Sequence, residues 1–373
     1  MKTKHRIFFL VAIIFSVAVM LSLNSCSNKN QNDKKIGAIL PLTGPSSYLG
    51  QSVLGGMKIA FEDFNKLNKT DYVLNSYDYQ GKLSSVNNIY QLTKTKNNPN
   101  LVLSWMSSVA SVLVQNTEKD NTLLFTGAAK PELTENTKFV IRLWPNAIDL
   151  ANIESNFAIN KLKCRNVGIF YINDDYGFAL ANQFSQKLND AKVNIVFKDA
   201  ASADVTDYRN IILKFKNKNI DLIYIAAYDQ TYTYLIKQVK QYLPDINILT
   251  DLTFCNYQNI KNLEKIGEGI YTVGTEIDNQ TTANTSTKQL MERINKDYHH
   301  NADFNSGLGY DMAWIALQAL NSTDGKAQTM KDYIVNKKNF DGKSGNIVFE
   351  PSGNAKFNLY LLQLRNGRLL EVK

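Results

Sequence analysis

Histidine and cysteine are scarce in this sequence, and their scarcity limits the chemistry that the protein can perform. The three histidines are His5, in an apolar N-terminal segment, and the adjacent pair His299-His300, whose polar surroundings are typical of a solvated helix end. The sequence also lacks HExxH, CxxC, GxSxG and GxxxxGK[ST], the motifs of zinc, redox, acyl-transfer and phosphate-loop sites. Asp174-Asp175 are adjacent acids of the kind that are usually solvated or capping. These features indicate a protein that is not an enzyme and that needs no metal or cofactor.

No concentrated basic block stands out either. The formal charge is +8, and it falls to +5 without residues 1–25, because that segment holds Lys2, Lys4 and Arg6 and no acid. The remaining lysines alternate with acids and asparagines, as in KDYHHNADF and KFKNKNIDL. Nucleic-acid binding normally needs a concentrated basic stripe, so we exclude nucleic acid as a partner.

The N-terminus has the pattern of a sorting signal. The basic MKTKHR precedes an apolar run over residues 7–23, which suits a signal-peptide core and is marginal for a membrane span. Leu23-Asn24-Ser25-Cys26 resembles the cleavage site of bacterial lipoproteins, in which the cysteine is acylated. We therefore expect a signal peptide over 1–25, a lipid on Cys26 that anchors the protein to the membrane, and a flexible tether over 26–35. An ordinary cleaved signal and an uncleaved anchor are alternatives; all three place the chain outside the cytoplasm, in the periplasm or on the cell surface.

Only Cys164 and Cys255 remain once Cys26 is lipidated. An oxidising compartment permits a disulfide between them. We favour the alternative that they are two buried free thiols.

Strand-like and helix-like segments alternate from Lys35 onward. This order is typical of βαβ units with parallel sheets, and several strands are apolar throughout, as expected when helices cover both faces. A second series of alternating strands and helices begins beyond Pro145, and the C-terminal part is rich in β-strand patterns. The sequence thus predicts an α/β protein in two halves. The predicted strands of the two series are 36–40, 72–79, 101–105, 122–126, 139–143, 166–172, 193–200, 221–228 and 246–250.

The stretch 35–65 predicts a strand, a loop of small and hydroxyl residues, and a helix. Gly44-Pro45 break the strand pattern, and apolar residues at helical spacing follow. Gly55-Gly56 lie inside that helix, where they indicate close packing. A strand that leads through an exposed loop to a helix N-terminus is a common way to build a binding site in an α/β protein.

Other strand ends carry residues suited to small-molecule capture. Ser107 and Ser108 follow the strand that ends at Trp105 and precede a helix, whose N-terminus offers free N–H groups to a carboxylate. One of the two serines can also simply cap its helix. Tyr176 and Tyr228, each between a strand and a helix, could cover an apolar part of a ligand or serve only in packing.

Together these stretches resemble the type I periplasmic binding proteins, in particular the leucine/isoleucine/valine-binding proteins of ABC importers. The resemblance runs from about residue 35 to the C-terminus. It implies two doubly wound, Rossmann-like α/β lobes joined by three crossings, with the ligand in the cleft between them and hinge closure around it. We expect lobe 1 to comprise 36–145 and 275–340, and lobe 2 to comprise 146–274 and 341–373. The matching segments, in the order of the family, are 36–65, 123–135, 167–184, 307–321 and 340–355.

The resemblance also implies which residues contact the ligand. Ser107 and Ser108 occupy the loop that takes an amino acid's α-carboxylate, and the loop over 43–51 forms one wall of the cleft. The complete expected set is Ser46, Ser47 and Tyr48 in the first loop, Trp105, Ser107, Ser108, Ala128 and Ala129 in the rest of lobe 1, and Tyr176, Tyr228 and Asp251 in lobe 2.

Several positions depart from the pattern of the family. Ala129 stands where a hydroxyl is usual, Met106 where a serine is common, and Leu49 where an aromatic precedes the glycine. The segment 248–256 offers no glutamate for an α-ammonium group, and a buried ammonium without an acid is costly. These departures count against an ordinary aliphatic amino acid as the ligand.

The function implied by the resemblance is that of a monomeric, lipid-anchored solute receptor. It would deliver a small polar, amino-acid-like ligand to the permease subunits of an ABC importer. A second hypothesis is a ligand-independent lipoprotein that activates a peptidoglycan synthase, since similar lipoproteins use this fold in that way. A ligand sensor that feeds a membrane receptor is a third.

Overall fold

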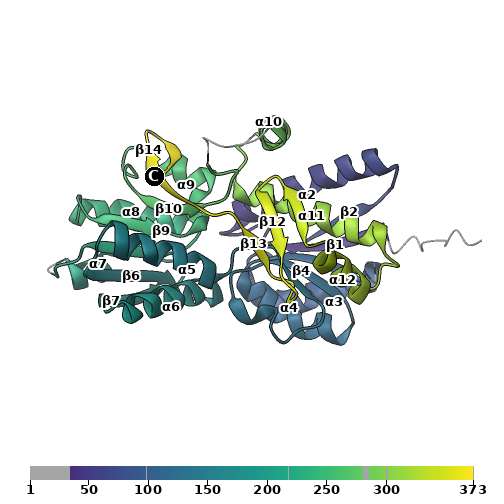
Figure 1. The fold of residues 1–373 in the computed structure, drawn as a ribbon, viewed down its shortest axis with the longest axis horizontal. Coiled ribbons are helices and arrows are strands. Elements are labelled where there is room, and N and C mark those ends of the chain that lie inside the picture. The colour runs from purple at the N-terminus through teal and green to yellow at the C-terminus, as the bar shows by residue number, and fades with distance from the viewer. Residues whose placement is uncertain (1–33, 98, 217, 280–284, 300, 373) are drawn as a thin grey trace, which may run out of the picture.

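Two α/β lobes lie side by side in the computed structural model, which describes residues 34–97, 99–216, 218–279, 285–299 and 301–372 (Figure 1). The predicted signal peptide, Cys26, most of the tether and His300 lie outside the described residues. Within the described ranges, no helix combines the length and the apolar content needed to span a bilayer.

Lobe 1 is built on a five-stranded sheet with the order β2-β1-β3-β4-β5, in which every pair is parallel. β3 and β4 are buried along their whole length, as expected for strands covered on both faces. The strands are β1 (Lys35–Leu40), β2 (Val73–Asp78), β3 (Leu101–Trp105), β4 (Leu123–Gly127) and β5 (Val140–Arg142).

Lobe 2 has a seven-stranded sheet with the order β15-β14-β10-β9-β8-β6-β7. Read from its other edge, β7-β6-β8-β9-β10 has the same strand order as the sheet of lobe 1. β6 to β10 are parallel, and the C-terminal pair β14 and β15 adds an antiparallel edge. The strands are β6 (Asn166–Ile172), β7 (Asn194–Ala201), β8 (Leu222–Ala226), β9 (Asn247–Thr250), β10 (Tyr271–Gly274), β14 (Tyr360–Arg365) and β15 (Arg368–Glu371). All nine predicted strands are confirmed, with ends within two residues of the prediction.

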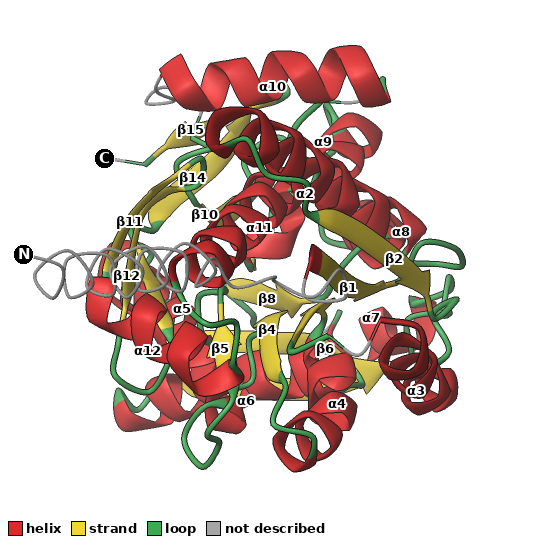
Figure 2. Cartoon of the chain, turned by 90° about the vertical axis from the view of Figure 1, so that its right-hand side faces the viewer, coloured by secondary structure: helices red, strands yellow, loops and turns green. Residues whose placement is uncertain are grey.

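Helices cover both faces of each sheet (Figure 2). In lobe 1, β1 packs through Ala38 into the large core that it shares with α2 and α11, and through Ile39 into a smaller core that it shares with α3 and α4. In lobe 2, α5 packs against α6. The helices are α2 (Ser47–Asn68), α3 (Val86–Asn97), α4 (Ser107–Lys119), α5 (Ala147–Asn156), α6 (Asp175–Asp190), α7 (Arg209–Phe215), α8 (Gln230–Tyr242), α9 (Tyr257–Leu263), α10 (Thr285–Tyr298), α11 (Phe304–Ser322) and α12 (Ala327–Lys337).

The close packing predicted at Gly55-Gly56 is confirmed for the contact between α2 and α11. A Cβ atom on Gly56 would lie 2.0 Å from the carbonyl oxygen of Ser306, and one on Gly309 would lie 2.4 Å from that of Val53. The two helix backbones therefore approach to a distance that only glycine allows at these positions. Gly55 differs, because a Cβ there would make ordinary contacts with Ile294 and Tyr298.

Three segments of the chain connect the lobes: residues 143–146 between β5 and α5, the segment after β10, and residues 358–359 (Figure 1). The last of these follows a small antiparallel sheet of β11 (Asn339–Gly342), β12 (Gly345–Phe349) and β13 (Ala355–Phe357). This sheet lies against lobe 1, where Phe349 contacts Phe125 and the Arg142 amide donates to the Gly353 carbonyl. The expected division assigned 341–373 to lobe 2; from these contacts we propose that lobe 1 extends to about residue 357.

Cys164 and Cys255 are both buried and free. The prediction of two buried thiols is thus confirmed, and the alternative of a disulfide is wrong.

Candidate functional site

The lobes face each other through loops at the carboxyl ends of their parallel strands. In both sheets the strand order reverses direction beside the first strand, between β1 and β3 in lobe 1 and between β6 and β8 in lobe 2. Such reversal points leave a crevice at the carboxyl ends of the strands, which is where open α/β sheets bind ligands. The expected site residues lie in these loops or in the first turns of the helices that follow them.

A small cavity of about 30 Å³ lies between the lobes at this point. It has room for roughly one or two water molecules, whereas sites for small organic ligands usually exceed about 300 Å³. The two lobes therefore lie close together around this cavity. The cavity is lined by Leu49, Trp105, Met106, Ser107, Gly127, Ala128, Ala129, Trp144, Tyr176, Tyr228 and Thr253.

The lobe 1 wall is formed by the two loops after β3 and β4. The Ala129 amide donates a 3.0 Å hydrogen bond to the hydroxyl of Ser107, which ties the loops together. The Trp105 indole lies edge-on to Trp144, with 5.4 Å between ring centroids. A Cβ on Gly127 would lie 2.3 Å from the Trp105 ring, so the glycine is what allows the indole to lie across the strand end.

The lobe 2 wall consists of Tyr176 and Tyr228, whose hydroxyls are already engaged. Tyr176 donates to Asp251 at 2.7 Å, and Tyr228 donates to Asp174 at 2.8 Å. Asp174 also caps α6, because it accepts hydrogen bonds from the amides of Tyr176 and Gly177. The two phenol rings meet edge-to-face at 6.0 Å. These tyrosines therefore offer the cavity ring surface rather than hydroxyl groups.

Asp251 is buried, and its carboxylate is saturated with hydrogen bonds. One oxygen accepts from the Tyr176 hydroxyl and from the amide and hydroxyl of Thr253. The other accepts from the Tyr232 hydroxyl and the Ala227 amide. Burial raises the pKa of Asp251, and these hydrogen bonds act in the opposite direction. The arrangement makes Asp251 a positioning residue for the tyrosines of this wall.

Of the expected contact residues, the structure brings Trp105, Ser107, Ala128, Ala129, Tyr176 and Tyr228 together around the cavity. The others lie just outside it. α2 begins at Ser47, so Ser47 and Tyr48 belong to the helix, and Tyr48 donates to Asp303 at 3.3 Å while Leu49 lines the cavity. Ser46 precedes α2, and Ser108 lies half-buried in the first turn of α4.

Among the residues of the site that were not anticipated are Trp144, Tyr232 and Thr253. Trp144 lies in the first crossing and contacts Trp105, Tyr176 and Phe304. Its indole nitrogen is buried and has no hydrogen-bond partner among the described residues. The pattern Trp144-Pro145 at the expected crossing could have indicated this position, since the crossing borders the cleft. No local pattern distinguishes Tyr232 or Thr253.

The lobes are also joined across the mouth of the cleft. Asp175, at the start of α6, accepts a 2.6 Å hydrogen bond from Ser111 of α4 and lies 3.2 Å from the ammonium group of Lys130. Both charged side chains are more than a third exposed, so the ion pair stabilises closure only weakly.

We expect Lys130→Met to shift the protein toward the open form. The lost ion pair is worth about 0.5 kcal/mol, which would lower the ratio of closed to open molecules about two- to threefold. Fluorescence energy transfer between one dye on each lobe measures this ratio. Lys138→Met removes the same charge from an exposed site of lobe 1 and should leave the ratio unchanged; an equal effect of both variants would contradict a role of the pair.

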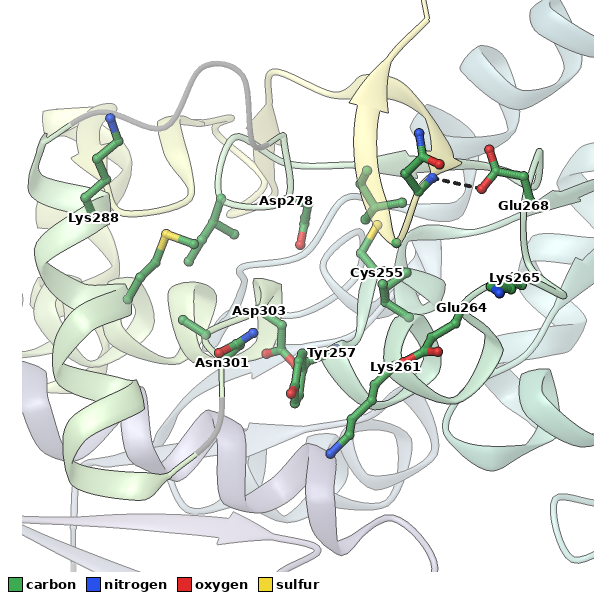
Figure 3. Close-up of a pocket in the computed structure, with 17 residues that line it drawn as sticks. Cys255, Tyr257, Lys261, Glu264, Lys265, Glu268, Asp278, Lys288, Asn301 and Asp303 are labelled. Atoms are coloured by element: carbon green, nitrogen blue, oxygen red, sulfur yellow. Dashed lines mark hydrogen bonds between the residues drawn. The ribbon is translucent and has the colours of Figure 1, made fainter.

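A second, larger pocket of about 960 Å³ lies between α9, α10 and the turn from β14 to β15. Asp278, Cys255 and Asp303 lie toward its centre, and lysines and glutamates surround them (Figure 3). Burial raises the pKa of Asp278 to about 7 and also raises the pKa of the Cys255 thiol. This pocket holds charges of both signs, and it adjoins the expected ligand site through Asp303, which accepts a hydrogen bond from Tyr48.

The sequence matches the model of a family described as "Periplasmic binding protein" over residues 34–368. It is 22% identical over 314 residues to a Leu/Ile/Val-binding protein homolog 7 of Brucella abortus (strain 2308), which covers 79% of this chain and 78% of the relative. A Leu/Ile/Val/Thr-binding protein of Salmonella typhimurium is 28% identical over 125 residues, 33% of this chain and 34% of the relative.

Solved structures share the fold. A leucine binding protein from Thermotoga maritima superposes with a TM-score of 0.84 at 21% identity, over 91% of this chain and 97% of that chain. A solute binding protein from R. palustris in complex with benzoate superposes with a TM-score of 0.81 at 14% identity, over 91% and 95%.

Proposed function

This chain belongs to the periplasmic binding protein family, and on that premise we propose that it is the substrate-binding component of an ABC importer. It captures a small polar, amino-acid-like ligand in the cleft by hinge closure. The observation that carries this proposal is the convergence of loops from both lobes on one cavity, with Ser107 and Ala129 on one side and Tyr176 and Tyr228 on the other. Proteins of this fold whose structures contain isoleucine and leucine support an amino-acid-like ligand.

The chemistry of the walls supports a ligand with a polar end and an apolar part. The first turn of α4 presents backbone amides at Ser107 and Ser108, where a carboxylate gains from the positive end of the helix. The phenol rings of Tyr176 and Tyr228 would cover an apolar part. The buried indole N–H of Trp144 has no partner among the described residues, so a ligand oxygen that reached it would satisfy an otherwise unpaired donor.

We further propose that the mature protein is a monomer anchored by a lipid on Cys26, in the periplasm or at the cell surface. The tether would let it reach the permease subunits, to which the closed form presents both lobes.

We expect Ser108→Glu to weaken ligand binding by at least about a hundredfold, because like charges brought together cost several kcal/mol. An acid in the first turn favours the helix, so the variant should fold. Isothermal titration of the full chain in mild detergent, against the L-amino acids and aromatic carboxylates, measures the effect. Ser108→Ala keeps the backbone amide and should bind nearly as well as the unaltered protein. Unchanged affinity in Ser108→Glu would show that the ligand binds elsewhere. If the unaltered protein binds no compound of the panel, the proposed function is wrong.

A second candidate function is a ligand-independent lipoprotein that activates a peptidoglycan synthase. The observation that favours it is the small volume of the cavity, about 30 Å³, between the aromatic side chains that line it. Pull-down from detergent extracts separates the two candidates. Enrichment of a cell-wall synthase would favour the second function, and enrichment of permease subunits the first.

A further inference from the structure

Asp229 has an unusual position at the cleft. It follows β8 and immediately precedes α8, but its side chain does not cap that helix. Its backbone lies at φ 50° and ψ −138°, a region that costs a residue with a side chain about 1–3 kcal/mol. Strain of this kind persists only where the surrounding structure enforces it, and it is concentrated at functional sites.

The carboxylate of Asp229 is buried without a partner. Neither oxygen accepts a hydrogen bond from the described residues. The Ser46 hydroxyl of lobe 1 is close enough to lower its pKa, but burial outweighs this effect and raises the pKa to about 6. A buried carboxylate without a counter-charge is costly.

The groups that face Asp229 come from both lobes, and none of them is a cation. They are Ser46 before α2, Tyr48 in α2, Tyr79 after β2, Tyr228 at the end of β8 and Asp303 before α11. Tyr228, the neighbour of Asp229 in the chain, lines the cavity. The site therefore has an unsatisfied negative charge beside its ligand cavity, while the carboxylate of Asp251 is fully engaged by five hydrogen bonds.

We propose that Asp229, rather than Asp251, is the counter-charge for a protonated nitrogen of the ligand and thereby selects ammonium-bearing molecules. The proposal rests on the proposed function, since it assigns the substrate class of the same cleft. A cation placed between Ser46 and Asp229 on closure would pair with a charge that is otherwise buried alone. Asp229 could instead serve only in closure through its contact with Ser46, and the experiment must separate these two roles.

The test compares an amino acid with its deaminated analogue. Isothermal titration of the full chain in mild detergent at pH 7.5 uses L-amino acids, beginning with L-leucine, and for each the carboxylic acid without the amine, such as 4-methylpentanoate. Asp229→Asn should weaken amino-acid binding by at least about thirtyfold and change binding of the deaminated acid less than about threefold. Asp175→Asn, which breaks a different contact between the lobes, is the matched control and should weaken both ligands equally.

Asp229→Asn removes an unpaired buried charge, so its thermal midpoint should be no lower than that of the unaltered protein. A dependence on pH gives a second readout. Because pairing needs the ionised carboxylate, affinity for the amino acid should be about tenfold lower at pH 5 than at pH 7.5, and Asp229→Asn should lose this dependence.

Equal weakening of both ligands by Asp229→Asn would assign the residue to closure and overturn the proposal, and so would unchanged amino-acid binding. If the unaltered protein binds the deaminated acids as well as the amino acids, the proposal fails while the proposed function stands. If it binds neither, the proposed function fails as well.

Discussion

Asp251→Leu is expected to lower the free energy of unfolding by about 3–5 kcal/mol, because several buried hydrogen-bond donors lose their acceptor together. Leucine has the same branching at Cγ but is larger, and it accepts no hydrogen bond. The substitution would remove the acceptor of the Tyr176 hydroxyl and the shortest hydrogen bonds of the Tyr232 hydroxyl and the Ala227 amide, and each buried donor left unpaired costs about 1–3 kcal/mol. The loss is large because all of these groups are buried in one place.

Urea unfolding followed by circular dichroism measures this change. Asp251→Asn keeps one carbonyl oxygen and should cost less than the leucine variant. Asp245→Leu, at an exposed position in the loop before β9, is the matched control and should change stability by less than about 0.5 kcal/mol. A leucine variant at position 251 as stable as this control would contradict the hydrogen-bond network described above.

Gly56→Ala should destabilise the protein by about 3 kcal/mol, at the upper end of what overpacking usually costs. The new methyl group would meet the backbone oxygen of Ser306 at 2.0 Å, and a backbone atom cannot rotate away as a side chain can. The strain must therefore be relieved by separating α2 from α11, which together form one face of lobe 1.

The neighbouring Gly55 gives the matched comparison. A Cβ at Gly55 would lie 3.5 Å from a methyl group of Ile294, which is an ordinary contact. Gly55→Ala should thus gain helix propensity without a clash and raise the unfolding free energy by up to about 1 kcal/mol. Thermal unfolding of both variants side by side checks the opposite signs; equal effects would mean that the helices do not approach as described.

The strands and the two-lobe architecture could be predicted because they depend on local patterns. The apolar run of β6 and the strand-breaking Gly44-Pro45 after β1 act over a few residues, and the five matching segments indicated the order of the elements. The same reasoning located Ser107, Ala129, Tyr176 and Tyr228 near the cavity, since each follows a strand whose carboxyl end faces the cleft.

The start of α2 and the contacts around the cavity were harder to predict from the sequence. The loop expected over 43–51 is already helical from Ser47, because Gly44-Pro45 turn the chain earlier than the apolar pattern indicates. In this helix the Tyr48 hydroxyl donates a hydrogen bond to Asp303, which is 255 residues away in the chain. The local sequence around Tyr48 cannot predict a contact between residues so far apart.

The sequence by itself determined the alternation of strands and helices, the division into two halves and the strand ends at which a ligand site could lie, since these follow from hydrophobic periodicity and turn residues. Only the tertiary structure decided which polar groups are already paired. Asp251 and Asp229 have the same side chain and both follow a strand, yet one is saturated with hydrogen bonds and the other is buried alone. The reason is that the partners of Asp251 come from other elements of lobe 2, far apart in the sequence, so folding alone brings them together.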